Sequence, residues 1–208
     1  METETTQTTR TGLTDLANII SALALHASTD TARQTLCAIY ITNETMTATN
    51  SYTLAQWTPT EPITTGEPVL IDARNLTTAL NNLTKAAKQY RAAQVNLTIT
   101  GGHTWQLEAT TGDSDNPQTI GNYNGQTIIG EYPNTNQLLE TAACGQFEPT
   151  GYDPALLETI TKASRKISKQ TPLVIAQWIN PQKPTLFTTT TTTGELTQLL
   201  MPQRINTK

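Results

Sequence analysis

The sequence predicts an α+β fold in which a helix followed by antiparallel strands recurs three times. Threonine accounts for 44 of the 208 residues and often alternates with apolar residues, which is typical of half-exposed strands. Only 14% of the residues are charged, whereas a disordered chain is usually highly charged and poor in β-branched residues. Three stretches with helical spacing of apolar residues separate the Thr-rich segments, so we expect helices to alternate with small sheets.

The three helices are expected where Leu, Ile and Ala recur at helical spacing. The first spans residues 13–28 and follows a polar segment, residues 1–10, that we interpret as a flexible tail. The second follows Asp72, a plausible N-cap, and carries its apolar face to Ala87. The third begins at Asp153-Pro154, where proline at the first helical position sacrifices no hydrogen bond.

Strands are expected between and after these helices, bounded by turn residues. They cover residues 35–42, 45–57 with a turn at 49–51, 69–71, 94–100, 104–110, 127–129, 173–178, 185–193 and 196–202. Residues 111–126 are polar and rich in turn-forming residues, so we expect a long loop there.

The same order of elements recurs along the chain. Residues 69–72, a helix with Lys85 and Lys88 near its end, and a strand pair resemble residues 150–153, a helix ending in Lys166, and a second strand pair. The first helix and its strands fit the same plan. We therefore divide the chain into three units, near 11–66, 67–142 and 143–208.

The cations are concentrated in two short stretches, although the net charge of the chain is −4. Seven of the 13 Lys and Arg residues belong to them: Lys85, Lys88, Arg91, Lys162, Arg165, Lys166 and Lys169. They are either solvated helix ends, favoured there by the helix dipole, or a surface that contacts phosphates without reading sequence. Their recurrence at equivalent places in two units supports the second interpretation.

Nothing in the sequence supports an enzyme, a metal site or a cofactor. The two histidines, His26 and His103, are isolated, and no group of His, Cys and carboxylates has metal-binding spacing. Cys37 lies in an apolar strand and is expected in the core, and Cys144 lacks a base that could activate it. Phosphate-binding and nucleophile-elbow motifs are absent.

No apolar run is long enough for a membrane span, and residues 1–10 do not resemble a signal peptide. We therefore expect a cytoplasmic protein whose two thiols are reduced.

Three segments carry short motifs: residues 47–55 (TATNSYTLA), residues 130–133 (GEYP) followed by Leu138, and residues 199–205 (LLMPQRI). Together they resemble segments of the bacterial β sliding clamp, the processivity subunit of the replicative DNA polymerase. Residues 199–205 (LLMPQRI) resemble the family's terminal V-V-M-P-M-R-L. Residues 47–55 (TATNSYTLA) resemble V-A-T-D-G-H-R-L-A in its middle domain, and residues 130–133 (GEYP), followed by Leu138, resemble G-x-F-P-D-Y…V. The three segments occur in the family's order, on the repeat described above.

The resemblance implies a DNA-clamp fold, with helices on one face and antiparallel sheets on the other. It also implies a hydrophobic pocket that binds a short peptide carried by polymerases and other partners. Residue by residue, the pocket would comprise Thr49, Leu54, Pro133, Leu138, Leu199, Met201, Pro202 and Arg204. The alternative for Leu199 and Met201 is a final core strand. Ser51-Tyr52-Thr53 replaces the family's Gly-His-Arg, and Gln203 replaces its second C-terminal Met. We therefore expect the shape of the pocket and the peptides that it prefers to differ from those of the family.

The chain is shorter than the family, which has three domains of two units each. The resemblance divides it into a full clamp-like domain (11–142) and a half domain (143–208) similar to the end of the last one. A family ring has twelve units, so four copies of this chain would match it, unless the ring differs in size.

We therefore expect a shortened sliding clamp, of the kind a phage or mobile element would encode. Its partners would be double-stranded DNA, polymerase, other clamp-binding peptides, a clamp loader and further copies of itself. The alternative is a clamp-derived module or decoy that binds clamp-seeking peptides, or the host clamp, without encircling DNA. A third interpretation, a β-rich structural protein similar only in fold, is disfavoured by the terminal motif.

Overall fold

The computed structural model describes residues 6–60, 67–90, 93–100, 102–112, 117–141, 150–168, 173–178 and 182–203, the side chains of residues 6–10 and 141 excepted. In chain order the elements are β1 (Thr6–Gly12), α1 (Leu13–Leu23), η1 (Gln34–Cys37), β2 (Ala38–Ile41), β3 (Met46–Thr49), β4 (Thr53–Pro59), β5 (Val69–Asp72), α2 (Ala73–Ala86), η2 (Ala87–Gln89), β6 (Gln94–Thr100), β7 (Thr104–Thr111), β8 (Gln118–Gln126), α3 (Asn136–Thr141), α4 (Pro154–Ile167), β9 (Ile175–Gln177), β10 (Thr185–Thr191) and β11 (Gly194–Leu200).

The α+β class and the three-fold repetition of helix and strands are confirmed. Unit one comprises β1 to β4, unit two β5 to β8, and unit three α4 to β11. Helices α2 and α4 begin where their sequences predict. Asp72 accepts a hydrogen bond from the amide of Asn75 at 2.8 Å, and Asp153 accepts one from the amide of Ala155 at 2.7 Å.

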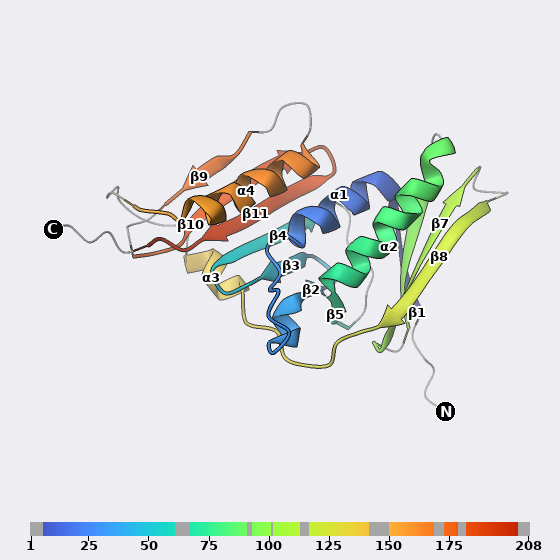
Figure 1. Ribbon diagram of the computed structural model, residues 1–208, viewed down its shortest axis with the longest axis horizontal. Helices are drawn as coiled ribbons and strands as arrows, with labels where there is room; N and C mark the ends of the chain where they lie inside the picture. Colours follow the sequence, from blue (N-terminus) through green and yellow to red (C-terminus); the bar gives the residue numbers. More distant parts are fainter. Residues whose placement is uncertain are drawn as a thin grey trace.

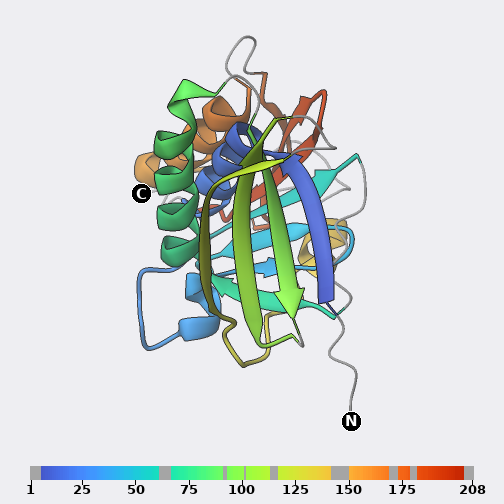
Figure 2. The ribbon, with the colours of Figure 1, turned by 90° about the vertical axis from the view of Figure 1, so that its right-hand side faces the viewer.

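Units one and two exchange their first strands. Strand β1 of unit one pairs with β6 of unit two, and β5 of unit two pairs with β2 of unit one. One sheet has the order β1-β6-β7-β8, and the other the order β5-β2-β3-β4-β11-β10-β9 (Figure 2). The exchange makes the two units one reciprocal body with a shared core.

Unit three joins unit one through its last strand. Strand β11 pairs antiparallel with β4, from Gly194 opposite Pro59 to Leu200 opposite Thr53, and so extends the sheet of unit one to seven strands. Helices α4, α1 and α2 lie in a row on the same side of the sheets, with α1 in the middle (Figure 1). The expected arrangement of helices on one face and sheets on the other is therefore present.

Helix α1 occupies the centre of the core because it contacts α2 on one side, α4 on the other, and strands β3 and β4 of the seven-stranded sheet. Ile20 and Leu23 are almost completely buried, as are Leu80 and Leu83 on α2. All four belong to one large cluster that also contains Trp57 and Leu107 from the two sheets. Burial of each such side chain stabilises the fold by about 1.5–3 kcal/mol.

A buried polar cluster links units one and three between the sheet and the helices. His26, which follows α1, contacts Gln198 of β11 through Nε2 and Oε1 at 2.9 Å. Gln198 donates to the Ser164 hydroxyl of α4 at 2.9 Å, and Thr189 of β10 donates to the same oxygen at 2.8 Å. All four side chains are buried. The contact between Gln198 and His26 thus ties β11 of unit three to unit one, and the two bonds to Ser164 hold α4, β10 and β11 together within unit three. Water cannot easily replace these buried hydrogen bonds.

Two sequence predictions were wrong. Residues 1–10 were expected to form a flexible tail, but Thr6–Gly12 is strand β1, paired over its whole length with β6; residues 1–5 lie outside the described part. Residues 111–126 were expected to be a loop, but Gln118–Gln126 forms β8. A Cβ at Gly125 would lie 2.7 Å from the Trp105 ring, so glycine is what lets this polar strand lie close against β7.

Smaller differences concern element boundaries. Helix α1 is shorter than the expected 13–28, and residues 34–37 form a 3-10 turn before the strand. Residues 127–129 run on as an extended segment outside the sheets, and helix α3 was not expected. Within the part of the chain that the structure describes, no helix is long and apolar enough to cross a membrane.

The acid sensitivity of the fold should depend on His26. Burial lowers the pKa of His26 from 6.5 to about 4, although its hydrogen bond to Gln198 acts in the opposite direction. Between these pH values the unfolded chain binds a proton that the folded chain does not. The contribution of neutral His26 to the free energy of unfolding is therefore complete above pH 6.5. It is lost as the pH falls towards 4, by about 3 kcal/mol in total.

We expect urea unfolding of His26→Gln between pH 4 and 7 to show a shallower loss of stability with falling pH than the unmodified protein. The control is His103→Gln at the exposed His103, which should keep the original slope. Equal slopes for both variants would contradict the assignment.

Candidate functional site: an apolar pocket at the junction of units one and three

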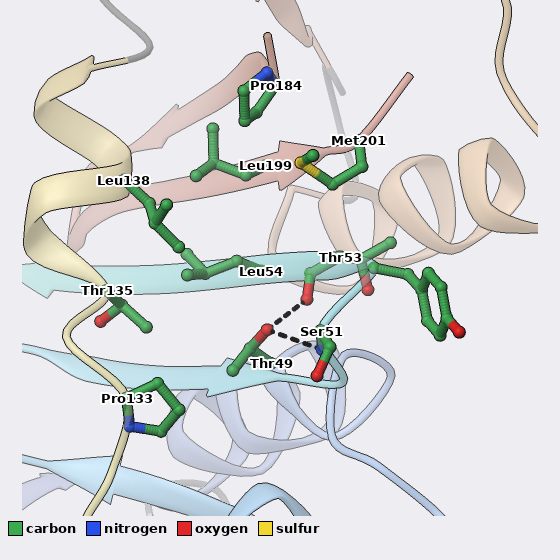
Figure 3. A pocket seen from close by; sticks show the side chains of 11 residues that line it. Thr49, Ser51, Thr53, Leu54, Pro133, Thr135, Leu138, Pro184, Leu199 and Met201 are labelled. Carbon is green, nitrogen blue, oxygen red and sulfur yellow. Dashed lines mark hydrogen bonds between the residues drawn. The ribbon is translucent and has the colours of Figure 1, made fainter. Parts of the chain in front are cut away.

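A pocket of about 250 Å³ opens on the face of the seven-stranded sheet that points away from α1, α2 and α4. It lies where β4 and β11 join the two units (Figure 3). Its lining residues are Thr49, Ser51, Tyr52, Thr53, Leu54, Pro133, Thr135, Leu138, Pro184, Leu199 and Met201. None of them carries a charge, so the pocket suits an apolar ligand group with a few polar contacts at its edge.

The floor of the pocket is a cross-strand leucine pair. Leu54 of β4 lies opposite Leu199 of β11, and each is 3% exposed. Leu139 and Leu186 pack against the pair. Successive strand residues point to opposite faces of the sheet. Leu199 therefore faces the pocket, while its neighbour Gln198 faces His26 on the helix side. The polar cluster and the pocket floor are therefore two faces of one strand junction.

One wall is formed by the segment that follows β8 and crosses the outer face of the sheet. Tyr132 holds it there, since its ring stacks on Tyr40 of β2 with centroids 4.8 Å apart, and its hydroxyl donates to the Thr47 carbonyl at 3.4 Å. Burial raises the pKa of Tyr132 well above its usual value, so the hydroxyl remains a donor. From this anchor the chain places Pro133 at the pocket and Leu138, on α3, pointing towards Leu54 (Figure 3).

The opposite end is the β3–β4 turn, which is held by its own side chains. Thr49 donates through Oγ1 to the Thr53 carbonyl at 2.7 Å and accepts from the Ser51 amide at 3.2 Å. Asn50 Oδ1 accepts from the amides of Tyr52 and Thr53 at 2.9 and 2.8 Å. The Met201 amide donates to the Tyr52 carbonyl at 3.3 Å, which ties the end of β11 to this turn.

The rim of the pocket leaves large apolar groups in contact with water. Tyr52 is 62% exposed, Leu138 49% and Met201 43%. Exposed apolar groups gathered around a cavity are typical of a binding site, because a ligand that covers them gains the free energy of their burial.

Six of the eight residues assigned to the pocket from the sequence line it: Thr49, Leu54, Pro133, Leu138, Leu199 and Met201. Pro202 is partly buried but is not among the lining residues, and Arg204 lies outside the described part. Sequence reasoning did not select Ser51, Tyr52, Thr53, Thr135 or Pro184. The first three lie inside a motif that it had quoted, and nothing in the sequence pointed to Pro184, which precedes β10.

The basic residues lie on the helix side. Lys85 and Lys88 are exposed at the end of α2 and in η2, and Lys162, Arg165 and Lys166 are exposed on α4. Lys162 forms an exposed ion pair with Glu158 at 3.1 Å. Arg91 and Lys169 lie outside the described part. The central helix α1 contributes the exposed Asp15 and no Lys or Arg, so the cations form two groups separated by α1.

A second cavity, of about 370 Å³, lies between the turn after α1 and the start of α2. Arg74 reaches across its edge to the Thr29 carbonyl at 3.2 Å. Cys37 lines it, is almost fully buried and donates to the Asp30 carbonyl, and burial raises the pKa of its thiol. A protonated buried thiol is inert. Among the side chains that the structure describes, no group of three or more His, Cys, Asp or Glu could hold a metal ion.

Comparison with known proteins identifies the fold of the chain. No protein-family model and no curated protein matches the chain. Its structure is similar to the β sliding clamp of Caulobacter crescentus (TM-score 0.66, 14% identity, 99% of this chain and 67% of that chain). It is also similar to the sliding clamp of Pseudomonas aeruginosa (0.66, 12%, 96% and 66%) and to the DNA polymerase III β subunit of Thermotoga maritima (0.62, 10%, 96% and 66%). The chain thus has the sliding-clamp fold and spans about two thirds of the length of these clamps.

The backbone at Ser51 should limit stability. Its φ is +77°, the left-handed region, where a side chain is disfavoured by about 1 kcal/mol or more. We expect Ser51→Gly to raise the free energy of unfolding by roughly 0.5–1 kcal/mol in denaturant titration. Ser51→Ala is the matched control: it also removes the hydroxyl that accepts from Arg33 but keeps a side chain at positive φ. A glycine variant no more stable than the alanine variant would show that the turn is unstrained.

Proposed function

We propose that this protein is a DNA sliding clamp-like processivity factor. It encircles double-stranded DNA as a homo-oligomeric ring and tethers a polymerase through the pocket between units one and three. The observation that carries the proposal is an uncharged apolar pocket, with an exposed apolar rim, at the strand junction of a chain with the sliding-clamp fold.

The pocket is suited to a short peptide rather than to catalysis. Its floor is two leucines, its walls include two prolines, and its polar groups are hydroxyls and backbone amides at the turn. Such a site binds Leu or Phe side chains and fixes the peptide backbone by a few hydrogen bonds. We propose no catalytic residue, metal or cofactor.

The helix side is suited to weak contacts with DNA. Lysine and arginine at the ends of α2 and α4 attract phosphates whatever the sequence, which a clamp that slides requires. The net charge of −4 keeps this attraction modest. Retention on DNA would therefore come from closure of the ring and not from affinity.

Closure requires more than one copy of this chain. Each copy contributes three units, so four copies would supply the twelve of a clamp ring. Among the described residues, β1, β8, β5 and β9 are the end strands of the two sheets, and β8 and β9 lie at opposite ends of the long axis (Figure 1). Open edges at both ends are what a ring-forming subunit needs. We propose cytoplasmic action on DNA with a polymerase, a loader and further copies as partners, in a phage or mobile-element setting.

A second candidate shares the pocket but not the ring. It is a clamp-derived module or decoy that captures clamp-seeking peptides or the host clamp. The negative net charge and the absence of cations on α1 favour it, because both weaken attraction to DNA. Closure around DNA discriminates between the two functions.

Leu138→Glu should weaken peptide binding by roughly tenfold or more, because it places a carboxylate on the wall of an uncharged pocket. Leu138 is half exposed, so the fold should tolerate the change. The measurement is fluorescence anisotropy of a labelled short peptide ending in Leu-Phe, with its Ala-Ala counterpart as the reference.

The matched control is Ile129→Glu, on the same crossing segment, at a residue 87% exposed and not among the pocket residues. It should bind the peptide as the unmodified protein does. Equal loss in both variants, or no preference for Leu-Phe over Ala-Ala, would count against the pocket.

Reversing the charge of Lys85, Lys88, Lys162 and Lys166 should lower processivity in primer extension on circular DNA. Replacing these four lysines by glutamates turns attraction to phosphate into repulsion. For a single-charge comparison, Lys88→Glu should have a measurable effect and Lys183→Glu, next to the pocket residue Pro184, should have little. Unchanged processivity in the quadruple variant would argue against a DNA-facing role for the helices.

A further inference from the structure

Met201 gives the pocket a chemically reactive group. It lines the cavity together with Leu54 and Leu199, but it is 43% exposed, whereas each of the two leucines is 3% exposed. Figure 3 shows its side chain at the end of β11, pointing back towards Leu199. The side chain is thus part of the apolar lining and is also open to solvent.

Main-chain hydrogen bonds on both sides hold Met201 at the rim. Its own amide donates to the Tyr52 carbonyl at 3.3 Å, and the Gln203 amide donates to the Gly151 carbonyl at 2.8 Å. The chain is therefore fixed between the β3–β4 turn and the segment that precedes α4. Because these contacts lie within the protein itself, the side chain is at the rim before any ligand arrives.

The methionines differ in their access to solvent. Met46, on β3, is 4% exposed and belongs to the core, and Met1 lies outside the described part. A thioether is oxidised only where the oxidant reaches its sulfur. Of the two methionines that the structure describes, Met201 is therefore the one that a small oxidant in solution can reach.

We infer that Met201 is an oxidation site through which peroxide weakens ligand binding in the pocket. The inference rests on the proposed peptide-binding function. In the reaction the sulfur lone pair attacks one oxygen of hydrogen peroxide, and the O–O bond breaks. That oxygen becomes the sulfoxide oxygen, and the other leaves as water with both protons. Sulfur is thus oxidised by two electrons, and peroxide is reduced.

A sulfoxide is poorly matched to this pocket. It places a strongly polar S=O group among apolar side chains that a ligand has to cover. Two hydroxyls of the lining are already engaged, since Thr49 donates to the Thr53 carbonyl at 2.7 Å and Thr53 donates through Oγ1 to Asn50 Oδ1 at 3.2 Å. An apolar ligand would therefore remove the S=O group from water without a hydrogen bond in return, which weakens binding.

Oxidant and ligand compete for the same side chain. A peptide that covers Met201 shields its sulfur from peroxide, so the empty pocket is the one that reacts. Methionine sulfoxide is reduced again by methionine sulfoxide reductases, so the change is reversible. The pocket would thus lose affinity under oxidising conditions and regain it when the sulfoxide is reduced.

The test measures peptide affinity of the full-length protein before and after treatment with hydrogen peroxide. Mass spectrometry of protein fragments should show that Met201 is oxidised faster than Met46, and that the labelled Leu-Phe peptide slows its oxidation. Fluorescence anisotropy should show roughly tenfold weaker binding once Met201 is oxidised. Treatment with methionine sulfoxide reductase and a thiol should restore the affinity.

Three variants separate Met201 from other targets of peroxide. Met201→Leu removes the thioether, so peroxide should not change its affinity, although it retains Cys37 and Cys144. Met201→Gln should weaken binding without peroxide, because it places an amide where the sulfoxide would lie. Ile129→Met in the Met201→Leu background moves the thioether to a residue that is 87% exposed and not among the pocket residues. Peroxide should oxidise it without changing the affinity.

A loss of affinity that requires Met201 supports the inference. Full affinity after complete oxidation of Met201, equal oxidation rates at Met201 and Met46, or the same loss in Met201→Leu would overturn it and leave the peptide-binding pocket in place. An unmodified protein that does not prefer the Leu-Phe peptide to its Ala-Ala counterpart would overturn the proposed pocket, and the inference with it. The two failures are therefore distinguishable.

Discussion

The antiparallel pairing of β4 with β11 is the contact on which the rest of the structure depends. It joins elements more than a hundred residues apart and makes one sheet of units one and three. On the outer face of the sheet it creates the leucine pair of the pocket floor, and on the helix side it places Gln198 against His26. A shift in the register of this pair by one residue would turn Gln198 into the pocket and Leu199 towards His26. The buried polar cluster therefore protects the geometry of the site, since only one register satisfies it.

The apolar rim of the pocket and the exposed apolar side chains of unit three lie at different places. The rim surrounds a concave cavity, a shape that suits a small segment of a partner. The exposed apolar side chains of unit three lie on α4 and in the segment of β9.

Local sequence signals predicted most elements correctly. Helix starts at Asp72 and Asp153 follow from capping, and the hairpin β6–β7 follows from alternation. The motifs also predicted the neighbourhood of Thr49, Leu54, Pro133, Leu138, Leu199 and Met201, which line one cavity. Strand β1 was missed because Thr6–Gly12 has no apolar residue to alternate with its threonines, and β8 was missed because Gln118–Gln126 is rich in Gly and Asn, which favour turns. They are strands because β6 and β7 offer partners, and because Gly125 permits close contact with Trp105.

The sequence by itself determined the fold class and most of the helices and strands, because periodicity and capping are local properties. Its resemblance to sliding-clamp motifs also singled out six residues that line the pocket. Tertiary structure alone decided which strands pair across units, and therefore that Pro184 reaches the pocket and that His26 is buried against Gln198. It alone decided that Leu157 of α4 is exposed, whereas Leu16 and Leu76, the fourth residues of α1 and α2 as Leu157 is of α4, are buried. The helices differ in burial because, among the described residues, units one and two exchange strands and share one core, whereas unit three joins unit one through a single strand pair.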